Sequence, residues 1–187
     1  PDYIDLFERY GITILQGYGM TECSPVISTT VAWDIRKNSV GKLLPNCEAK
    51  TEDGELWVRG SSVMQGYYKM PEATAATVDR EGWLHSGDLA CRDENGCYRI
   101  TGRLKDMIIR GGENIYPKEI EEFIYTHPAV KDVQVIGVPD RKYGEEAMAC
   151  IILKEPGSVT VEEMLDYIKA SMARHKVPKY IDFVDAF

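Results

Sequence analysis

Apolar residues recur at two spacings along the chain, and each spacing predicts one kind of element. Every third or fourth residue is apolar between Thr160 and Ala173, which is the helical period. Thr160 and Glu163 have the spacing of a capping box, so a helix is predicted to begin there. A second helix is predicted from Pro117 to about His127. The stripe of the first of these helices is predicted to be core: Val161, Met164, Leu165, Ile168 and Met172.

Two shorter helices are predicted nearer the N-terminus, at residues 2–10 and 71–78. Asp2 can cap the first of them, and Ile4 and Phe7 then share one apolar face. Pro71 stands at the first turn of the other, where a missing N–H costs nothing.

Short β-branched runs and turn dipeptides predict strands. Asp53-Gly54 predicts the turn of one hairpin, and residues 93–96 (Asp-Glu-Asn-Gly) predict a second. Residues 24–45 are expected to be irregular with brief strands, and residues 60–68 to form a loop. The predicted strands cover residues 12–15, 47–51, 55–58, 97–101, 133–138, 147–153 and 180–184.

This pattern predicts a mixed α/β (α+β) fold in two parts. Strands dominate as far as about Gly102, and helices and strands mix after it. The predicted domains are therefore residues 1–102 and residues 103–187. The chain has no internal repeat and no low-complexity tract.

The composition narrows the class of protein. A chain of 187 residues with 44% hydrophobic residues can bury a core. Its net charge of −8 disfavours non-specific binding to nucleic acid. No apolar run has the length of a membrane span, and the first residues do not resemble a signal peptide. The five cysteines are scattered and lack metal-ligand spacing, which favours a reduced, cytoplasmic protein.

Residues 102–114 lie between the two predicted parts and contain five charged residues and the pair Gly111-Gly112. Adjacent glycines mark a turn or a close approach of the backbone to a ligand. Two interpretations stay open: a solvated turn between β-segments, or part of a ligand site at a domain junction. Residues 16–22 follow a predicted strand and fit a ligand loop equally with an ordinary turn. Asp88 beside Gly87 is by itself usual turn chemistry.

Three motifs, in this order and spacing, resemble the adenylate-forming enzymes. They are residues 17–22 (Gly-Tyr-Gly-Met-Thr-Glu), residues 86–89 (Ser-Gly-Asp-Leu) and residues 102–106 (Gly-Arg-Leu-Lys-Asp). Residues 60–68 and 115–121 extend the likeness over essentially the whole chain. That superfamily includes acyl-CoA synthetases, firefly luciferase and peptide-synthetase adenylation domains, and the sequence is most similar to bacterial fatty acyl-CoA synthetases.

The resemblance implies an enzyme that uses ATP, Mg²⁺ and coenzyme A. A carboxylic acid, here a fatty acid, attacks the α-phosphate of ATP to give acyl-AMP, and the CoA thiol then displaces AMP. Positioning and charge neutralisation carry most of such chemistry. The first part would be the C-terminal portion of the large nucleotide-binding domain, and the second the small mobile domain.

The resemblance also implies residue roles in the first part. Tyr18 would stack on adenine, Gln16 and Gly17 would offer backbone groups to the nucleotide, and Gly19 would lie beside the acyl pocket. The remaining roles concern charge: Thr21 would bind the α-phosphate, Glu22 would bind Mg²⁺, and Asp88 would accept from the ribose hydroxyls.

In the second part, Arg103 would hold the ribose or a phosphate. Lys105 and Asp106 would form the hinge of the small domain, and Lys105 would also reach a nucleotide phosphate. Gly111 and Gly112 would flank the channel for the pantetheine arm of CoA. Asn114 would contact the nucleotide.

Two features of the superfamily have no counterpart in this sequence. No Ser/Thr/Gly-rich phosphate loop with a lysine precedes Gln16, and no Gly-Lys pair follows near Phe187. The chain is therefore expected to be part of a longer enzyme and inactive by itself. An adenylation domain that loads a carrier protein and a non-catalytic binding module remain as alternatives. The oligomeric state is not readable from the sequence.

Overall fold

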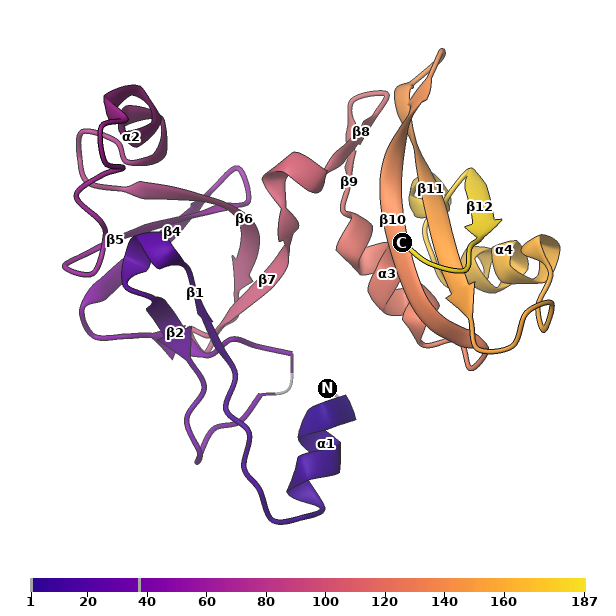
Figure 1. Cartoon of the computed structure of the whole chain (residues 1–187), viewed down its shortest axis with the longest axis horizontal. Coiled ribbons are helices and arrows are strands. Elements are labelled where there is room, and N and C mark those ends of the chain that lie inside the picture. Colours follow the sequence, from indigo (N-terminus) through magenta and orange to yellow (C-terminus); the bar gives the residue numbers. More distant parts are fainter. Residues whose placement is uncertain (1, 37) are drawn as a thin grey trace. The chain divides into compact units, whose positions relative to one another are not determined.

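The computed structural model describes residues 2–36 and 38–187, and it confirms the predicted mixed α/β class. The chain forms two compact units: the first ends at Thr101, and the second is Gly102–Phe187. Figure 1 labels the elements of both. Each unit has its own apolar core and is described by itself.

A four-stranded antiparallel sheet forms most of the first unit. Its strands lie in sequence order: β4 (Cys47–Glu52), β5 (Glu55–Gly60), β6 (Leu84–Arg92) and β7 (Tyr98–Arg103). The predicted hairpin at Asp53-Gly54 is confirmed: φ is 49° and 86° at these residues, as a two-residue turn of type I′ requires.

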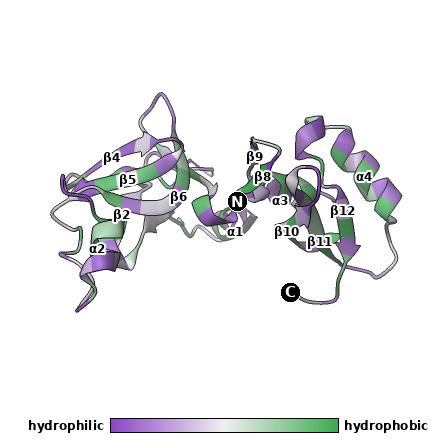
Figure 2. Ribbon diagram, turned by 90° about the horizontal axis from the view of Figure 1, so that it is seen from above, coloured by the Kyte–Doolittle hydropathy of each residue, from purple (hydrophilic) through white to green (hydrophobic). Residues whose placement is uncertain are grey.

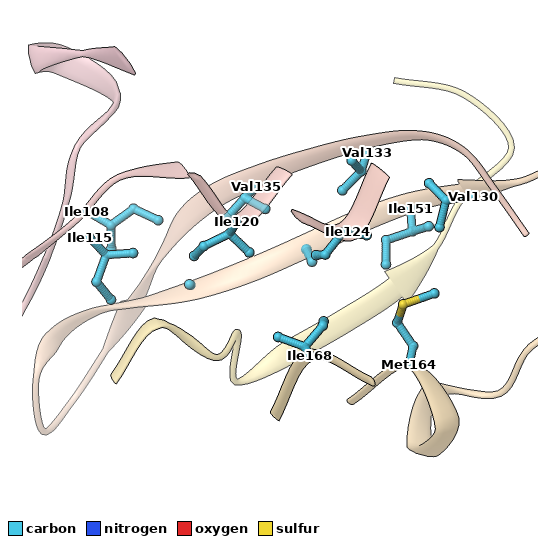
Figure 3. Close-up of a cluster of buried hydrophobic side chains, with 12 residues drawn as sticks. Ile108, Ile115, Ile120, Ile124, Val130, Val133, Val135, Ile151, Met164 and Ile168 are labelled. Carbon is cyan, nitrogen blue, oxygen red and sulfur yellow. The ribbon is translucent and has the colours of Figure 1, made fainter. Parts of the chain in front are cut away.

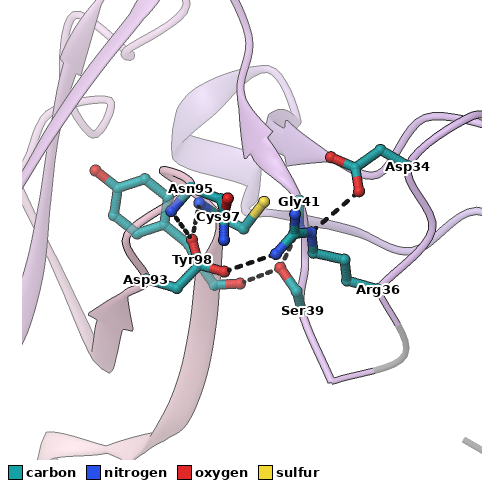
Figure 4. Close-up of polar contacts among 8 residues, drawn as sticks. All are labelled: Asp34, Arg36, Ser39, Gly41, Asp93, Asn95, Cys97 and Tyr98. Atoms are coloured by element: carbon teal, nitrogen blue, oxygen red, sulfur yellow. Dashed lines mark hydrogen bonds and ion pairs between the residues drawn. The ribbon is translucent and has the colours of Figure 1, made fainter.

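Polar contacts close the second predicted hairpin, between β6 and β7 (Figure 4). Asp93 Oδ1 accepts hydrogen bonds from the backbone of Asn95 and Cys97, at 2.9 and 2.8 Å. Arg36 donates to Asp93 from another loop at 3.4 Å. Ser39 donates to the backbone oxygen of Tyr98 at 2.8 Å. These polar residues therefore stabilise a turn.

A smaller antiparallel sheet contains β1 (Gly17–Gly19), β2 (Val26–Thr29) and β3 (Lys42–Leu43). The helices of this unit are α1 (Asp2–Glu8), α2 (Pro71–Thr77) and the 3₁₀ turn η1 (Thr21–Cys23). Both predicted helices are thus confirmed, although on α1 Ile4 is buried and Phe7 is exposed. The side chain of Asp2 lies outside the described residues, so its capping role stays a prediction.

The predicted buried strand at residues 12–15 is wrong. These residues have irregular backbone, and Ile12 and Leu15 are about half exposed. A β-branched run forms a strand only where a neighbouring strand pairs with it, and pairing with β2 begins only at Gly17.

Aromatic and basic side chains stack on one face of the larger sheet. The rings of Trp57 and His85 are stacked, with 3.8 Å between their centroids. Lys50 Nζ lies 4.6 Å from the Trp57 ring centroid, and the Arg59 guanidinium lies 4.5 Å from that of Trp83. Such cation–π contacts fix long basic side chains against the sheet.

The second unit is built on the long antiparallel hairpin of β10 (Val130–Asp140) and β11 (Gly144–Leu153). On the other side of β11, the parallel strand β12 (Tyr180–Phe183) pairs at Met148–Ile151, and β8 pairs at Gly144. The short hairpin β8 (Ile108–Arg110) and β9 (Glu113–Ile115) completes the sheet. The central stretch thus contains the turn between two β-segments that one interpretation predicted. The 3₁₀ turns of the second unit are η2 (Leu104–Asp106) and η3 (Arg174–Lys176).

Two helices, α3 (Pro117–Tyr125) and α4 (Val161–Lys169), contribute to the core of this unit. In Figure 3 their side chains meet those of the strands in one apolar cluster that includes Ile120, Ile124, Met164 and Ile168. Alternating hydrophilic and hydrophobic segments are visible along α4 in Figure 2.

The predicted capping box at the start of α4 is confirmed: the Glu163 amide donates to Thr160 Oγ1 at 3.2 Å, and the Thr160 amide donates to Glu163 Oε2 at 2.8 Å. The predicted core stripe differs at Leu165, which is half-buried and is not one of the residues of the apolar cluster. Two further details differ. The helix ends at Lys169, and Val161 is 40% exposed because it occupies the first helical position, away from the core stripe.

Among residues 2–36 and 38–187, no helix combines the length and the apolar character that crossing a membrane requires.

Candidate functional site

The structure brings together two motif residues that lie 70 positions apart. The hydroxyl of Tyr18, on β1, donates a hydrogen bond to Asp88 Oδ2 on β6 at 2.6 Å. Burial, and then the Asp88 carboxylate, raise the pKa of the Tyr18 hydroxyl well above its ordinary value. Tyr18 is therefore a protonated donor at neutral pH, and its ring is held in one orientation. A carboxylate has about four acceptor positions, and the bond from Tyr18 uses one of them.

A bulge in β6 sets the position of Asp88. His85 pairs with Trp57 and Leu89 pairs with Glu55, so residues 86–88 stand opposite Leu56 alone. Gly87 has φ of +70°, and its amide donates to Glu55 Oε1 at 2.9 Å. Bulges re-aim side chains next to functional sites. The Gly-Asp motif is thus a bulge inside a strand, whereas the sequence indicated only a turn.

Ser86 braces this bulge, and its sequence motif gave it no role. Its hydroxyl donates to the backbone oxygen of Leu56 at 2.6 Å and accepts from the Asp88 amide at 3.1 Å. The hydroxyl thereby connects Asp88 to the next strand.

The pairing of β1 with β2 explains the two glycines of the first motif and the place of Gln16 before it. A Cβ on Gly19 would lie 1.8 Å from the backbone oxygen of Pro25, and one on Gly17 would lie 3.1 Å from that of Ser28. The backbone of Gln16 makes two hydrogen bonds to Thr30: its amide donates to the side-chain Oγ1 at 2.8 Å, and its oxygen accepts from the Thr30 amide at 2.7 Å. Gly19 is therefore required by the close approach of two backbones, whatever ligand lies nearby.

Thr21 and Glu22 lie in η1, which follows β1 after the single residue Met20. Glu22 Oε1 accepts a hydrogen bond from the hydroxyl of Tyr67 at 2.8 Å. The backbone oxygen of Glu22 accepts from the Met64 amide at 2.7 Å. Tyr67 was missed by the sequence analysis, because no local pattern connects two residues that lie 45 positions apart.

The donor set around Glu22 suits a metal that is shared with a substrate. Within residues 2–36 and 38–187, no cluster of three or more His, Cys, Asp or Glu side chains could hold a metal ion by itself. Mg²⁺ commonly takes one or two protein carboxylates and completes its octahedron with water and phosphate oxygens. A single glutamate that follows a threonine in η1 fits that mode of binding.

Cys23, next to Glu22, has no nucleophilic role at neutral pH. The residue is fully buried, and burial raises the pKa of its thiol to about 11. The reactive thiolate is therefore scarce near pH 7.

The remaining candidate residues belong to the second unit. Arg103, Lys105 and Asp106 are exposed around η2. Gly111 and Gly112, with φ of 58° and 90°, form the tight turn between β8 and β9. Asn114, on β9, pairs with Ile109 and is exposed. These residues and those around Tyr18 belong to different units.

An ion pair lies beside the glycine turn. Arg110 Nε donates to Glu146 Oε2 at 2.6 Å, and the Glu146 side chain is only 3% exposed. The Arg110 guanidinium lies 4.3 Å from the ring centroid of Tyr143, and the Gly111 amide donates to the Tyr143 backbone oxygen at 2.9 Å. The turn is thus attached to β11 and to the end of the β10–β11 hairpin.

The same ion pair lines a cavity of about 600 Å³ in the second unit. Its wall includes four basic side chains, from Arg110, Lys169, Arg174 and Lys179. Lys179 is paired with Asp140 at 2.6 Å.

Comparison with known protein families assigns this chain to a family. Residues 1–68 match the family of AMP-binding enzymes, and residues 119–187 match the AMP-binding enzyme C-terminal domain. The chain belongs to the adenylate-forming superfamily. The membership predicted from the sequence motifs is therefore confirmed.

Curated relatives cover most of this chain. YngI of Bacillus subtilis, whose name places it among the acyl-CoA synthetases, is 52% identical over 97% of the chain. The human medium-chain acyl-CoA ligase ACSF2, a mitochondrial protein, is 44% identical over 91%. The chain spans about a third of the length of these relatives, 36% and 30% respectively.

Solved structures agree in fold. ATP-bound MatB from Rhodopseudomonas palustris has a TM-score of 0.88 and 34% identity over 94% of this chain and 37% of its own. The o-succinylbenzoate CoA synthetase MenE from Bacillus subtilis, in complex with ATP and a magnesium ion, has a TM-score of 0.86 and 34% identity. It covers all of this chain, which spans 41% of MenE.

Proposed function

We propose that this chain carries the C-terminal part of an ATP-dependent acyl-CoA synthetase that acts on fatty acids. In this proposal, residues 1–102 complete the large nucleotide-binding domain, and residues 103–187 form the small mobile domain. The observation that carries the proposal is the hydrogen bond between Tyr18 and Asp88, at 2.6 Å, which joins two superfamily motifs into one site. Membership of the superfamily and the names of the relatives support the reaction class.

The proposed reaction has two steps. A fatty acid carboxylate oxygen forms a bond to the α-phosphorus of ATP, and pyrophosphate leaves. The sulfur of CoA then bonds to the acyl carbon, the thiol proton passes to solvent, and AMP leaves. Mg²⁺, when bound, supplies positive charge to the phosphate oxygens.

The residues of the first unit would bind and orient the nucleotide. Tyr18, held by Asp88, would present its ring to adenine, and Asp88 would accept from the ribose hydroxyls. Gln16, Gly17 and Gly19 would shape the adjoining wall. Thr21 would donate to the α-phosphate, and Glu22 would provide the carboxylate oxygen for Mg²⁺.

The residues of the second unit would serve the hinge and the thiol step. Arg103 and Lys105 would contact the ribose or phosphates, with Lys105 and Asp106 at the pivot. Gly111 and Gly112 would border the pantetheine channel, where a side chain would obstruct passage, and Asn114 would contact the nucleotide. We also propose a cytoplasmic location, which the five free thiols support.

The test uses the complete reading frame that encodes this chain, assayed with fatty acids of different length. Fatty-acid-dependent pyrophosphate exchange and CoA-dependent thioester formation are expected, whereas the 187-residue chain alone is expected to show neither. D88A should reduce kcat/KM about 10- to 100-fold, the loss of hydrogen bonds to a charged group. E94Q, an exposed change near the β6–β7 turn, is the matched control. Thioester formation by D88A at the unsubstituted rate would contradict the proposed site.

A further inference from the structure

Tyr67 holds the side chain of Glu22 from a segment that the sequence analysis treated as a loop. Its hydroxyl donates to Glu22 Oε1 at 2.8 Å. The bond therefore engages one of the two carboxylate oxygens of Glu22. A carboxylate that is held by one oxygen presents the other in a fixed direction.

The tyrosine is itself fixed by the start of α2. The Tyr67 amide donates to Thr74 Oγ1 at 2.9 Å, and the hydroxyl of Thr74 donates to the Met70 backbone oxygen at 2.9 Å. Gly66 permits this approach, because a Cβ at its φ of +146° would lie 2.7 Å from Thr74 Cγ2. The backbone of Tyr67 is therefore tied to α2 independently of the bond from its hydroxyl to Glu22.

A second contact ties the same loop to η1. The Met64 amide donates to the backbone oxygen of Glu22 at 2.7 Å. The loop thus grips Glu22 at its backbone and at its carboxylate. Two contacts on one residue restrict both its place and its rotation, which is how supporting residues orient a metal ligand.

We propose that Tyr67 is a positioning residue that orients Glu22 toward the Mg²⁺ of Mg-ATP. The proposal rests on the proposed function for the role of Glu22, and on geometry for the role of Tyr67. Tyr67 touches neither nucleotide nor metal in this scheme. It acts through Glu22 by removing the freedom of one carboxylate oxygen.

The adjacent tyrosine supplies a matched control. Tyr68 is 86% exposed, and no hydrogen bond of its side chain appears among the described contacts. Y67F and Y68F therefore remove the same atom from neighbouring positions, and only Y67F removes the donor to Glu22. Both variants keep the ring, so neither opens a cavity.

The experiment uses the complete enzyme and titrates Mg²⁺ at saturating ATP and fatty acid, with pyrophosphate exchange as the signal. Y67F is expected to raise the half-saturating Mg²⁺ concentration about 5- to 10-fold, the usual worth of one hydrogen bond. The KM for the fatty acid should stay unchanged, and Y68F should match the unsubstituted enzyme. A purely structural role would change stability or kcat without changing the Mg²⁺ requirement.

A second measurement does not depend on activity. Amide hydrogen exchange is followed in the peptides that contain Met64 and Cys23, where Y67F should speed exchange several-fold and Y68F should not. An active Y67F enzyme with an unchanged Mg²⁺ requirement would overturn the role of Tyr67. Unchanged exchange in Y67F would overturn the contact itself. A third outcome is possible: the unsubstituted enzyme shows no pyrophosphate exchange, while amide hydrogen exchange is faster in Y67F. This result would overturn the proposed function, on which the binding of Mg²⁺ by Glu22 rests.

Discussion

The two units hold their candidate residues by different means. In the first unit, side-chain hydrogen bonds join segments far apart in sequence, as between Tyr18 and Asp88. In the second unit, the glycine turn is held by a short hairpin, one backbone bond to Tyr143 and the buried pair of Arg110 and Glu146. The first arrangement depends on how several loops pack, whereas the second depends on one hairpin and its neighbour.

This difference bears on which substitutions each unit can tolerate. Where backbones approach closely around a site, a small added group displaces several elements together. Where an exposed turn is supported in part by an ion pair, the vulnerable point is the buried partner of that pair. The following changes test this contrast.

The largest effect is expected from G19A. The new Cβ would lie 1.8 Å from the backbone oxygen of Pro25 and 2.8 Å from Val26 Cα, and backbone atoms cannot move aside cheaply. The free energy of unfolding of the first unit should fall by about 3 kcal/mol or more. Hydrogen exchange resolved by segment should show the loss at β1 and β2, with β10 and β11 still protected.

G157A is the control for this change. Gly157 has φ of +76° and nothing within 4 Å of an added Cβ, so only the backbone strain of about 1 kcal/mol applies. Equal losses in the two variants would refute the close-approach explanation for Gly19.

An intermediate effect is expected from E146A in the second unit. Removing a carboxylate that is 3% exposed leaves Arg110 without its partner. Because the Arg110 side chain is 24% exposed and can turn toward water, the cost should be about 2 kcal/mol, below that of a fully buried pair. Urea denaturation gives the change in unfolding free energy, and faster exchange of the Gly111 amide would locate it.

The exposed pair of Lys176 and Glu119 provides the comparison for E146A. The Glu119 side chain is 47% exposed, so E119A should cost below about 1 kcal/mol. If E119A proved as costly as E146A, burial would not be the reason for the sensitivity of the Arg110 pair.

The smallest effect concerns acid. Hydrogen bonds from Lys179 first, and then from the amides of Tyr143 and Lys142, lower the pKa of Asp140 from 3.8 to about 2. A lowered pKa stabilises the folded state above pH 3.8, and this contribution is lost as pH falls toward 2. Circular dichroism during urea unfolding at pH 5, 4, 3 and 2 should show a smaller decline of stability in D140N than in the unsubstituted chain. Parallel declines in both would argue against the Asp140 contribution.

Most of the second unit was predictable from sequence because its helices are amphipathic and its strands are long. The spacing of Thr160 and Glu163 predicts the start of α4, because a capping box at these positions satisfies the first amides of the helix. The prediction of a strand at residues 12–15 failed because an apolar run does not reveal whether a neighbouring strand will pair with it.

The site was predictable only as far as its motifs reach. Glu22 and Asp88 were identified through the family resemblance, but their supporting residues were not. Tyr67 lies in a loop with no period, and Ser86 acts through a bulge whose existence depends on the register of β5 against β6. Such contacts depend on tertiary packing, which a local pattern does not encode. The roles in nucleotide binding stay predictions.

All three tryptophans of the chain, Trp33, Trp57 and Trp83, lie before Thr101. Their fluorescence is therefore an intrinsic optical probe of the first unit alone, and the stack of Trp57 on His85 makes part of the signal sensitive to the separation of β5 and β6. Tryptophan emission would follow the melting of the unit that contains Tyr18 and Asp88 without a label, because the second unit contains tyrosine but no tryptophan.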